Sequence, residues 1–185
     1  MKYMKIIILC MPLLSFMRDA RISPQNSLFN SYAELENGFR GIQWGTSSNK
    51  YIDVQLTRTD GDIKIYKKKN EILDIQEGTL ASIDYHFWKD AFYEACLVVE
   101  GEKNWNALKK EFNSKIPALF TDTEIMGIYV EQPGRRHYNL GQGIEAYELK
   151  TDKFIIFIIY RDNLKDALVK IISAEIQTQI ENIKK

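Results

Sequence analysis

The stretch Leu80–Glu100 constrains the fold most. Its two halves can pair as a hairpin, and the need to bury apolar side chains selects one register for that pairing. A two-residue turn would place Glu94 opposite Tyr85, among apolar side chains. A three-residue loop, Lys89–Ala91, instead pairs Tyr85 with Ala95 and leaves one face of the hairpin apolar. Because a slip of one residue swaps the two faces of a strand, burial selects the second register. The sequence therefore predicts a long antiparallel hairpin in this stretch.

The second face of this hairpin carries side chains of a different kind. In the favoured register His86 lies opposite Glu94, and Asp84 lies opposite Cys96. Carboxylate, imidazole and thiol groups are ligands that a zinc-like ion accepts. A cross-strand His–Glu pair is also typical of an ordinary sheet surface, and a cysteine often packs as a small apolar side chain. These four residues are therefore a candidate metal site, with a plain sheet surface as the alternative.

Two hairpins, each followed by a helix, are expected in the body of the chain. Apolar residues recur at helical spacing in Glu102–Lys115, and Pro117 ends that helix. A second hairpin joins Ile144–Lys150 to Phe154–Tyr160, and an apolar stripe over Leu164–Ile183 predicts a long final helix. The fold class is thus α+β: a mainly antiparallel sheet with two hairpin-plus-helix units and the helices packed on it. The two units suggest a duplication, although any hairpin followed by a helix resembles another.

Residues 1–20 are predicted to be an export signal. Two lysines precede an almost wholly apolar stretch, Ile6–Met17. That layout is typical of a secretory signal, and the stretch is shorter than the roughly 20 residues that cross a bilayer. Cys10 would suggest a lipid anchor, but the residue before it is bulky where a small one is preferred. The alternative is an apolar element buried in the core of the domain.

The rest of the chain is expected to form one domain. The polar residues 21–38 are interpreted as a linker or loose lead-in, which leaves residues 39–185 as a single α+β domain. A chain of 185 residues is long enough to bury one core of its own. If the first segment is removed, Cys96 is the one cysteine left, so no internal disulfide can form. The 25 basic and 25 acidic residues balance, which argues against a dedicated nucleic-acid binder.

The segment Phe39–Thr46 has the sequence Phe-Arg-Gly-Ile-Gln-Trp-Gly-Thr, which suits an ordered turn pinned to the core by its aromatic rings. It resembles a motif near the mature start of uncharacterised bacterial exported proteins, many of them small lipoproteins. In those proteins the motif is Phe-Arg-Gly-Ile, any residue, Trp-Gly-Thr. The resemblance covers roughly residues 39–112. It implies export, and it brings no known activity, cofactor or catalytic residue.

Two further places are candidate ligand sites. The glycine-rich stretch Pro133–Gly143 is expected to be a loop, in which Arg135, Arg136 and His137 could hold a carboxylate or a phosphate. It does not have the strand-to-helix placement of a P-loop, so it does not indicate nucleotide binding. An ordinary surface loop is the alternative. Trp88, if exposed on the mixed face of the hairpin, would mark a partner or ligand surface.

Together these features predict a small exported bacterial envelope protein, periplasmic or membrane-anchored, that binds an unidentified protein or small ligand. It is more plausibly a binding module than an enzyme, and no cofactor is predicted. Nucleic acid is not an expected partner, and the membrane is one only through the N-terminal segment. The alternatives are a metal-assisted envelope enzyme that uses the Asp84, His86, Glu94 and Cys96 face, and a structural subunit that dimerises through the sheet or the last helix. The expected oligomeric state is a monomer or a weak homodimer.

Overall fold

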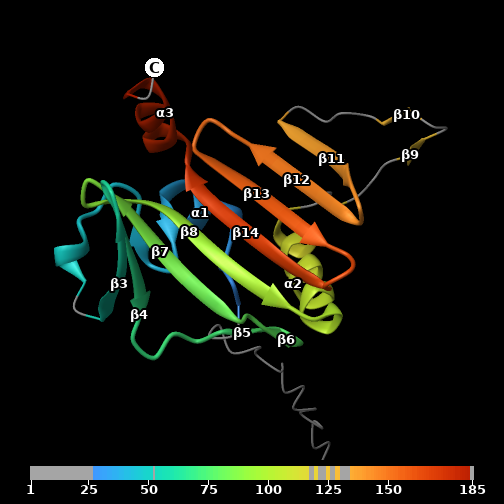
Figure 1. Cartoon of the computed structure of the whole chain (residues 1–185), viewed down its shortest axis with the longest axis horizontal. Coiled ribbons are helices and arrows are strands. Elements are labelled where there is room, and N and C mark those ends of the chain that lie inside the picture. The colour runs from blue at the N-terminus through green and yellow to red at the C-terminus, as the bar shows by residue number, and fades with distance from the viewer. Residues whose placement is uncertain are drawn as a thin grey trace, which may run out of the picture.

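A computed structural model of the protein describes residues 27–51, 53–116, 119–120, 124–125, 128–129 and 134–183. Eight antiparallel strands form its main sheet, in the order β11-β12-β13-β14-β8-β7-β4-β3 (Figure 1). The strands are β3 (Val54–Asp60), β4 (Ile63–Lys68), β7 (Ser82–Trp88), β8 (Ala91–Glu100), β11 (Arg135–Gly141), β12 (Ile144–Lys150), β13 (Phe154–Arg161) and β14 (Asp166–Ser173). The predicted export segment lies outside the described residues.

Shorter elements surround this sheet. Three helices are described, α1 (Tyr32–Asn37), α2 (Glu102–Lys115) and α3 (Ala174–Ile183), together with a single 3₁₀ turn at Ser48–Lys50. Three small strand pairs join β1 (Gly38–Phe39) to β2 (Ile42–Gln43), β5 (Asp74–Ile75) to β6 (Gly78–Thr79), and β9 (Glu124–Ile125) to β10 (Ile128–Tyr129). The α+β class with a mainly antiparallel sheet is confirmed.

The central hairpin of β7 and β8 has the predicted pairing of Tyr85 with Ala95 and of His86 with Glu94. Its turn differs from the expected three-residue loop. Lys89 and Asp90 form a two-residue turn with positive φ angles of 46° and 69°, which matches the right-handed twist of the strands. A register shift beside His86 adds one residue to β8 and restores the predicted pairing farther along.

The predicted final helix is wrong over its first half, where the chain forms strand β14 and pairs with both β13 and β8. Leu164, Leu168 and Ile172 recur every four residues, a spacing that places side chains on one face of a helix and of a strand alike. The residues between them decide the structure, because Val169 and Ile171 are buried in the core at period two. The second unit is therefore a meander of four strands, β11 to β14, followed by a short helix.

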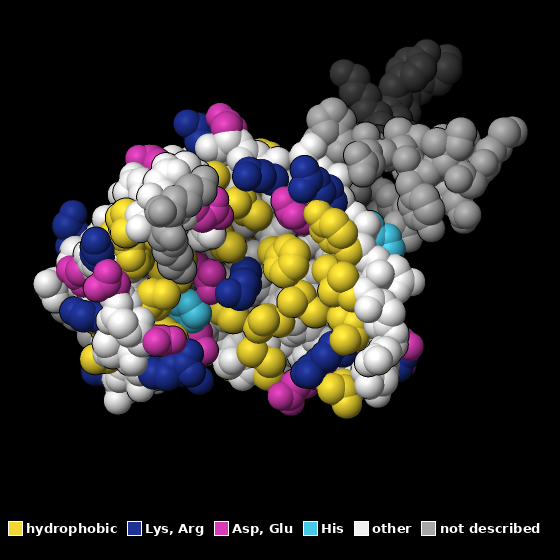
Figure 2. Space-filling model, turned by 45° about the horizontal axis from the view of Figure 1, so that its top comes forward, with side chains coloured by type: hydrophobic (Ala, Val, Ile, Leu, Met, Phe, Trp, Pro, Cys, Tyr) yellow, Lys and Arg dark blue, Asp and Glu magenta, His cyan; other side chains and the backbone are white. Residues whose placement is uncertain are grey.

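One face of the sheet carries the core, and the other is largely uncovered. α1, α2, β1–β2 and β5–β6 pack on the core face, whose cluster includes Tyr85, Leu97, Phe112 and Ile158. On the opposite face α3 covers one end, over Tyr93 and other residues of a small second cluster. Hydrophobic side chains gather on this opposite face beyond the helix, with charged side chains between them (Figure 2). No helix among the described residues is both long and apolar enough to cross a membrane.

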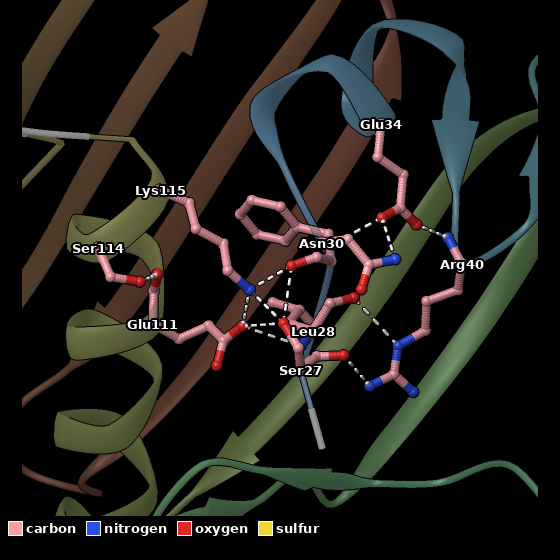
Figure 3. A network of polar contacts seen from close by, with 9 residues as sticks. Ser27, Leu28, Asn30, Glu34, Arg40, Glu111, Ser114 and Lys115 are labelled. Carbon is pink, nitrogen blue, oxygen red and sulfur yellow. Dashed lines mark hydrogen bonds and ion pairs between the residues drawn. The ribbon is translucent and has the colours of Figure 1, made fainter. Parts of the chain in front are cut away.

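The segment interpreted as a linker belongs to the core from residue 27 onward. Leu28, Phe29 and Leu35 are at most 1% exposed. The first of these donates its backbone N–H to the Glu111 carboxylate on α2 at 3.0 Å, within a network that also holds Lys115 (Figure 3). The expectation of a loose lead-in is thus corrected for residues 27–38.

The Phe39–Thr46 motif has a structural role in the fold. Trp44 stacks on Phe92 of β8 at 4.8 Å between ring centroids, and its indole N–H donates to the Leu35 carbonyl at 2.9 Å. The Gly45 backbone N–H donates to the Phe92 carbonyl at 2.8 Å, and the Phe92 N–H donates to the Thr46 carbonyl at 3.0 Å. These contacts confirm the predicted turn pinned to the core.

Candidate functional site

A pocket of about 220 Å³ lies on the core face of the sheet, beside the N-terminal half of α2. Its floor is an aromatic stack in which the rings of Trp105 on α2 and Tyr160 on β13 lie 4.6 Å apart and 11° from parallel. The helical spacing of α2 directs Trp105 toward the sheet, where it is 3% exposed. Lys109, one turn later, places its ammonium 5.3 Å from the indole centroid. The stack therefore joins helix to sheet and gives the pocket an apolar base.

The wall of the pocket is built from β12 and its neighbour β11. Glu145 and Tyr147 are two residues apart on β12 and so point to the same face. The Tyr147 hydroxyl donates to the Glu145 carboxylate at 2.5 Å. His137 of β11 stacks on Tyr147 at 4.5 Å, and its Nε2 lies 3.9 Å from the same carboxylate. His137, predicted as a ligand residue, thus lies directly behind the pocket wall.

The charged groups at the rim are mixed, with carboxylates in excess. Glu102, Glu145 and Asp162 face Lys109 and Lys165 around the opening. The Lys165 ammonium lies 2.6 Å from Asp162, and that hydrogen bond lowers the pKa of the carboxyl below its usual value. One carboxylate is therefore neutralised at the rim. The remaining rim groups, Glu102, Glu145 and Lys109, carry a net negative charge. That charge favours a ligand that is neutral or positively charged and donates hydrogen bonds.

The other predicted ligand residues are distributed differently from the expectation. The stretch expected to be a loop is strand β11, and its pairing places Arg135 and His137 on the core side and Arg136 on the open side. Trp88 is half-buried against the cluster under α3, with the Lys89 ammonium 4.8 Å from its ring. From the sequence, Trp105 is predicted to lie in the helix Glu102–Lys115, and Trp105, Tyr147 and Tyr160 have no predicted role in a site. Their convergence depends on where α2 docks, which no local pattern specifies.

The four predicted metal residues lie together on the face of β7 and β8 away from the core. Glu94, 4% exposed, contacts His86 Nδ1 at 2.9 Å and the Lys170 ammonium at 3.2 Å. Asp84 turns instead to Lys67, at 3.7 Å. Burial, and then the charge of Glu94, raises the pKa of the Cys96 thiol to about 11, which disfavours the thiolate that binds metal.

No group of three or more His, Cys, Asp and Glu side chains in the described part of the chain is placed to hold a metal ion. Lys170 supplies the positive charge that a cation would otherwise bring to Glu94. The arrangement gives the metal interpretation no ligand set, and it matches the alternative of cross-strand pairs on a sheet surface.

Glu94 makes the stability of the protein depend on pH. Burial raises the pKa of Glu94, but the hydrogen bond from His86 and the charge of Lys170 outweigh burial and hold that pKa below its usual 4.5. The stabilisation is therefore present above pH 4.5 and is lost as the pH falls through the folded-state pKa. We expect Glu94→Gln to lower the free energy of unfolding by about 1–2 kcal/mol at pH 7. The free energy of unfolding of this variant should also decrease less steeply as the pH falls in the acid range.

Urea unfolding across the acid range measures this effect. Glu100→Gln is the control, because Glu100 is exposed at the end of the same strand and its replacement should leave the pH profile unchanged. If the free energy of unfolding of the wild type and of Glu94→Gln decreased equally steeply at acid pH, the assignment of this pH dependence to Glu94 would be contradicted.

Comparison with known proteins found no matching family model, no matching curated protein and no matching solved structure. The resemblance of Phe39–Thr46 to a motif of exported proteins therefore stays a prediction.

Proposed function

We propose that the protein is a non-enzymatic binding module of the bacterial envelope that holds a small ligand in the pocket between α2, β12 and β13. The observation that carries the proposal is the convergence of an aromatic floor, an aromatic wall and charged rim groups from separate elements on one cavity. Ligand sites combine aromatic or apolar surface with polar groups that fix the orientation of the ligand, and this pocket combines three aromatic rings with a larger set of charged groups. Export to the envelope rests on the basic and apolar pattern of residues 1–20.

The size and charge of the pocket indicate the kind of ligand. Its volume of about 220 Å³ is below the range of roughly 300–1,000 Å³ that accommodates drug-sized molecules. The aromatic base favours a ligand with an apolar face, and the carboxylates of Glu102 and Glu145 favour hydrogen-bond donors opposite them. A sugar ring and a small primary amine both combine these properties, whereas a small carboxylic acid does not.

The proposal predicts that Glu145→Gln weakens ligand binding about tenfold or more, the equivalent of roughly 1.4 kcal/mol. The substitution keeps the shape of the side chain and removes its charge. Glu148→Gln is a matched control, because Glu148 lies three residues along the same strand and faces the other side of the sheet. Binding would be measured by titration calorimetry with monosaccharides, primary amines and small carboxylates as probes.

The outcomes distinguish the site from general surface binding. We expect an amine or a sugar to bind the wild type and the Glu148→Gln variant alike. Equal weakening by the two substitutions would place the ligand elsewhere, and failure of every sugar and amine to bind would contradict the proposal.

A further inference from the structure

A second cavity, of about 390 Å³, lies between the N-terminal segment and the end of β4. Its walls are the chain before and within α1, the turn between β1 and β2, the residue before β3, and the loop that follows β4. Two of its wall residues, Glu34 and Arg40, are drawn in Figure 3. The cavity shares no lining residue with the pocket beside α2, and its volume falls within the roughly 300–1,000 Å³ of small-molecule sites. It is therefore a separate candidate ligand site.

The frame of this cavity consists of polar groups that already satisfy one another. One carboxylate oxygen of Glu71 contacts the Arg40 guanidinium at 2.6 Å, and the other accepts from the Tyr85 hydroxyl at 2.7 Å. Both oxygens of Glu34 are also occupied, because they accept N–H groups of Arg40 and Asn30. These bonds hold the walls in place and make Arg40 and Glu71 a neutral pair.

Lys68 carries a positive charge in this cavity that no carboxylate neutralises. Its ammonium donates to the Arg40 carbonyl at 2.8 Å and lies 5.3 Å from the centre of the Tyr85 ring. Both of these partners are neutral, and among the residues that the structure describes Lys68 forms no ion pair. An ammonium has three N–H donors, so donors and the positive charge remain available to a ligand. Because Lys68 is half-buried, water screens its attraction for an anion less than at an exposed site.

Asp53 supplies a negative charge beside the same ring. The Asp53 carbonyl accepts from the Lys69 N–H at 2.6 Å, which brings Asp53 level with the end of β4. Burial, followed by the charge of Glu71, raises the pKa of Tyr85, and the charge of Asp53 adds to this effect. The Asp53 carboxylate therefore acts on the ring over which Lys68 lies. In the described part of the chain this carboxylate has no ion-pair partner, so it too can meet a ligand.

A separated ammonium and carboxylate on one cavity suit a ligand that carries both charges. Apart from the neutral pair, the charged residues of the wall are two of each sign: Lys68, Lys69, Glu34 and Asp53. A ligand with several negative charges, such as a phosphate, would be repelled by the two carboxylates, whereas a zwitterion can meet each sign with its opposite. Ile72 is 43% exposed on the same wall and offers an apolar contact. The chemistry of the cavity thus matches an amino acid with an apolar side chain.

We propose that this cavity binds a free α-amino acid with an apolar side chain. The carboxylate of the ligand pairs with the Lys68 ammonium, its ammonium pairs with the Asp53 carboxylate, and its side chain packs against Ile72. Each pair is a charge-assisted hydrogen bond, the stronger kind in proteins. The site shares no group with the pocket beside α2, so this inference does not depend on the ligand proposed for that pocket.

Titration calorimetry of the full chain with leucine tests the proposal, and isocaproate is the matched probe because it is leucine without the amino group. We expect leucine to bind the wild type and isocaproate to bind it about tenfold more weakly. Lys68→Met should weaken both ligands, whereas Asp53→Asn should weaken leucine alone, because isocaproate has no ammonium. Failure of leucine to bind would overturn the proposal, as would isocaproate binding as tightly as leucine.

Two control variants complete the test. Lys64 is exposed on the same strand and lies outside the cavity, so Lys64→Met should bind leucine as the wild type does. Glu145→Gln, in the pocket beside α2, should also leave the affinity for leucine unchanged. Leucine binding that is lost in Glu145→Gln and kept in Lys68→Met would place the amino acid in the other pocket and overturn the inference. Circular dichroism checks the fold of each variant, and the exposed Asp53 keeps the test decisive if Lys68→Met does not fold.

Discussion

Replacing Arg40 by methionine should lower the free energy of unfolding by about 3–5 kcal/mol, because the substitution removes one partner of a buried ion pair. The guanidinium of Arg40 lies 2.6 Å from the Glu71 carboxylate, and the two side chains are 11% and 13% exposed. It also donates to the backbone carbonyls of Leu28 and Ser27 at 3.2 and 3.4 Å, and to that of Ile72. Arg40 therefore joins the N-terminal segment to the loop after β4.

The loss of Arg40 would extend to the centre of the sheet. The second oxygen of Glu71 accepts a hydrogen bond from the Tyr85 hydroxyl at 2.7 Å. Burial, followed by the charge of Glu71, raises the pKa of Tyr85 far above its usual value, so the hydroxyl stays protonated and donates. Without Arg40 the Glu71 carboxylate keeps this neutral donor but loses its cation, and the burial of its charge is no longer compensated.

Unfolding of Arg40→Met and of Arg161→Met in guanidinium chloride measures the effect. Arg161 also pairs with a carboxylate, that of Asp166, but its side chain is 50% exposed. Exposed pairs contribute little to stability, so the unfolding midpoint of Arg161→Met should stay close to that of the wild type. Equal midpoints for the two variants would contradict a structural role for the arginine in the Phe39–Thr46 motif.

Periodicity and burial predicted the strand pairing where only one register keeps a strand face apolar. The pairing of Tyr85 with Ala95 followed from keeping Glu94 out of the core, and the structure has that pairing. The turn was mispredicted because the bulge beside His86 shifts the pairing near the turn by one residue, while the pairing of Tyr85 with Ala95 farther along is unchanged. Strand β14 was mistaken for a helix because a four-residue repeat fits both periods; its β-branched residues were the signal that could have corrected it.

The candidate pocket was less predictable, because its residues meet through tertiary packing. His137 was singled out for its chemistry, while Trp105 and Tyr160 belong to segments 55 positions apart that α2 brings into contact. The polar composition of residues 21–38 likewise concealed Leu28 and Phe29, which are isolated among polar neighbours and show no period. Their burial depends on Glu111 and Lys115, which satisfy the backbone groups beside them.

A chain that begins at residue 39 should therefore fail to fold, whereas a chain that begins at residue 27 should fold. The first loses Leu28, Phe29 and Leu35, each of which contributes roughly 1.5–3 kcal/mol by burial. The sum of these contributions is comparable to the 5–15 kcal/mol of net stability of an ordinary domain. The rings of Phe29 and Phe112 also lie 5.4 Å apart, so the loss of Phe29 opens a cavity beside α2.

The shorter chain also leaves a charge buried without its partners. Glu111 is 0% exposed, and its Oε1 accepts from the Leu28 N–H at 3.0 Å and from the Ser27 hydroxyl at 2.7 Å. Lys115, which pairs with Glu111, also donates to the Phe29 carbonyl. Truncation at residue 39 removes all these partners except Lys115 itself. Near-ultraviolet circular dichroism and amide chemical-shift dispersion of the two chains measure the result. A cooperative thermal transition in the chain that begins at residue 39 would show that residues 27–38 are dispensable to the core.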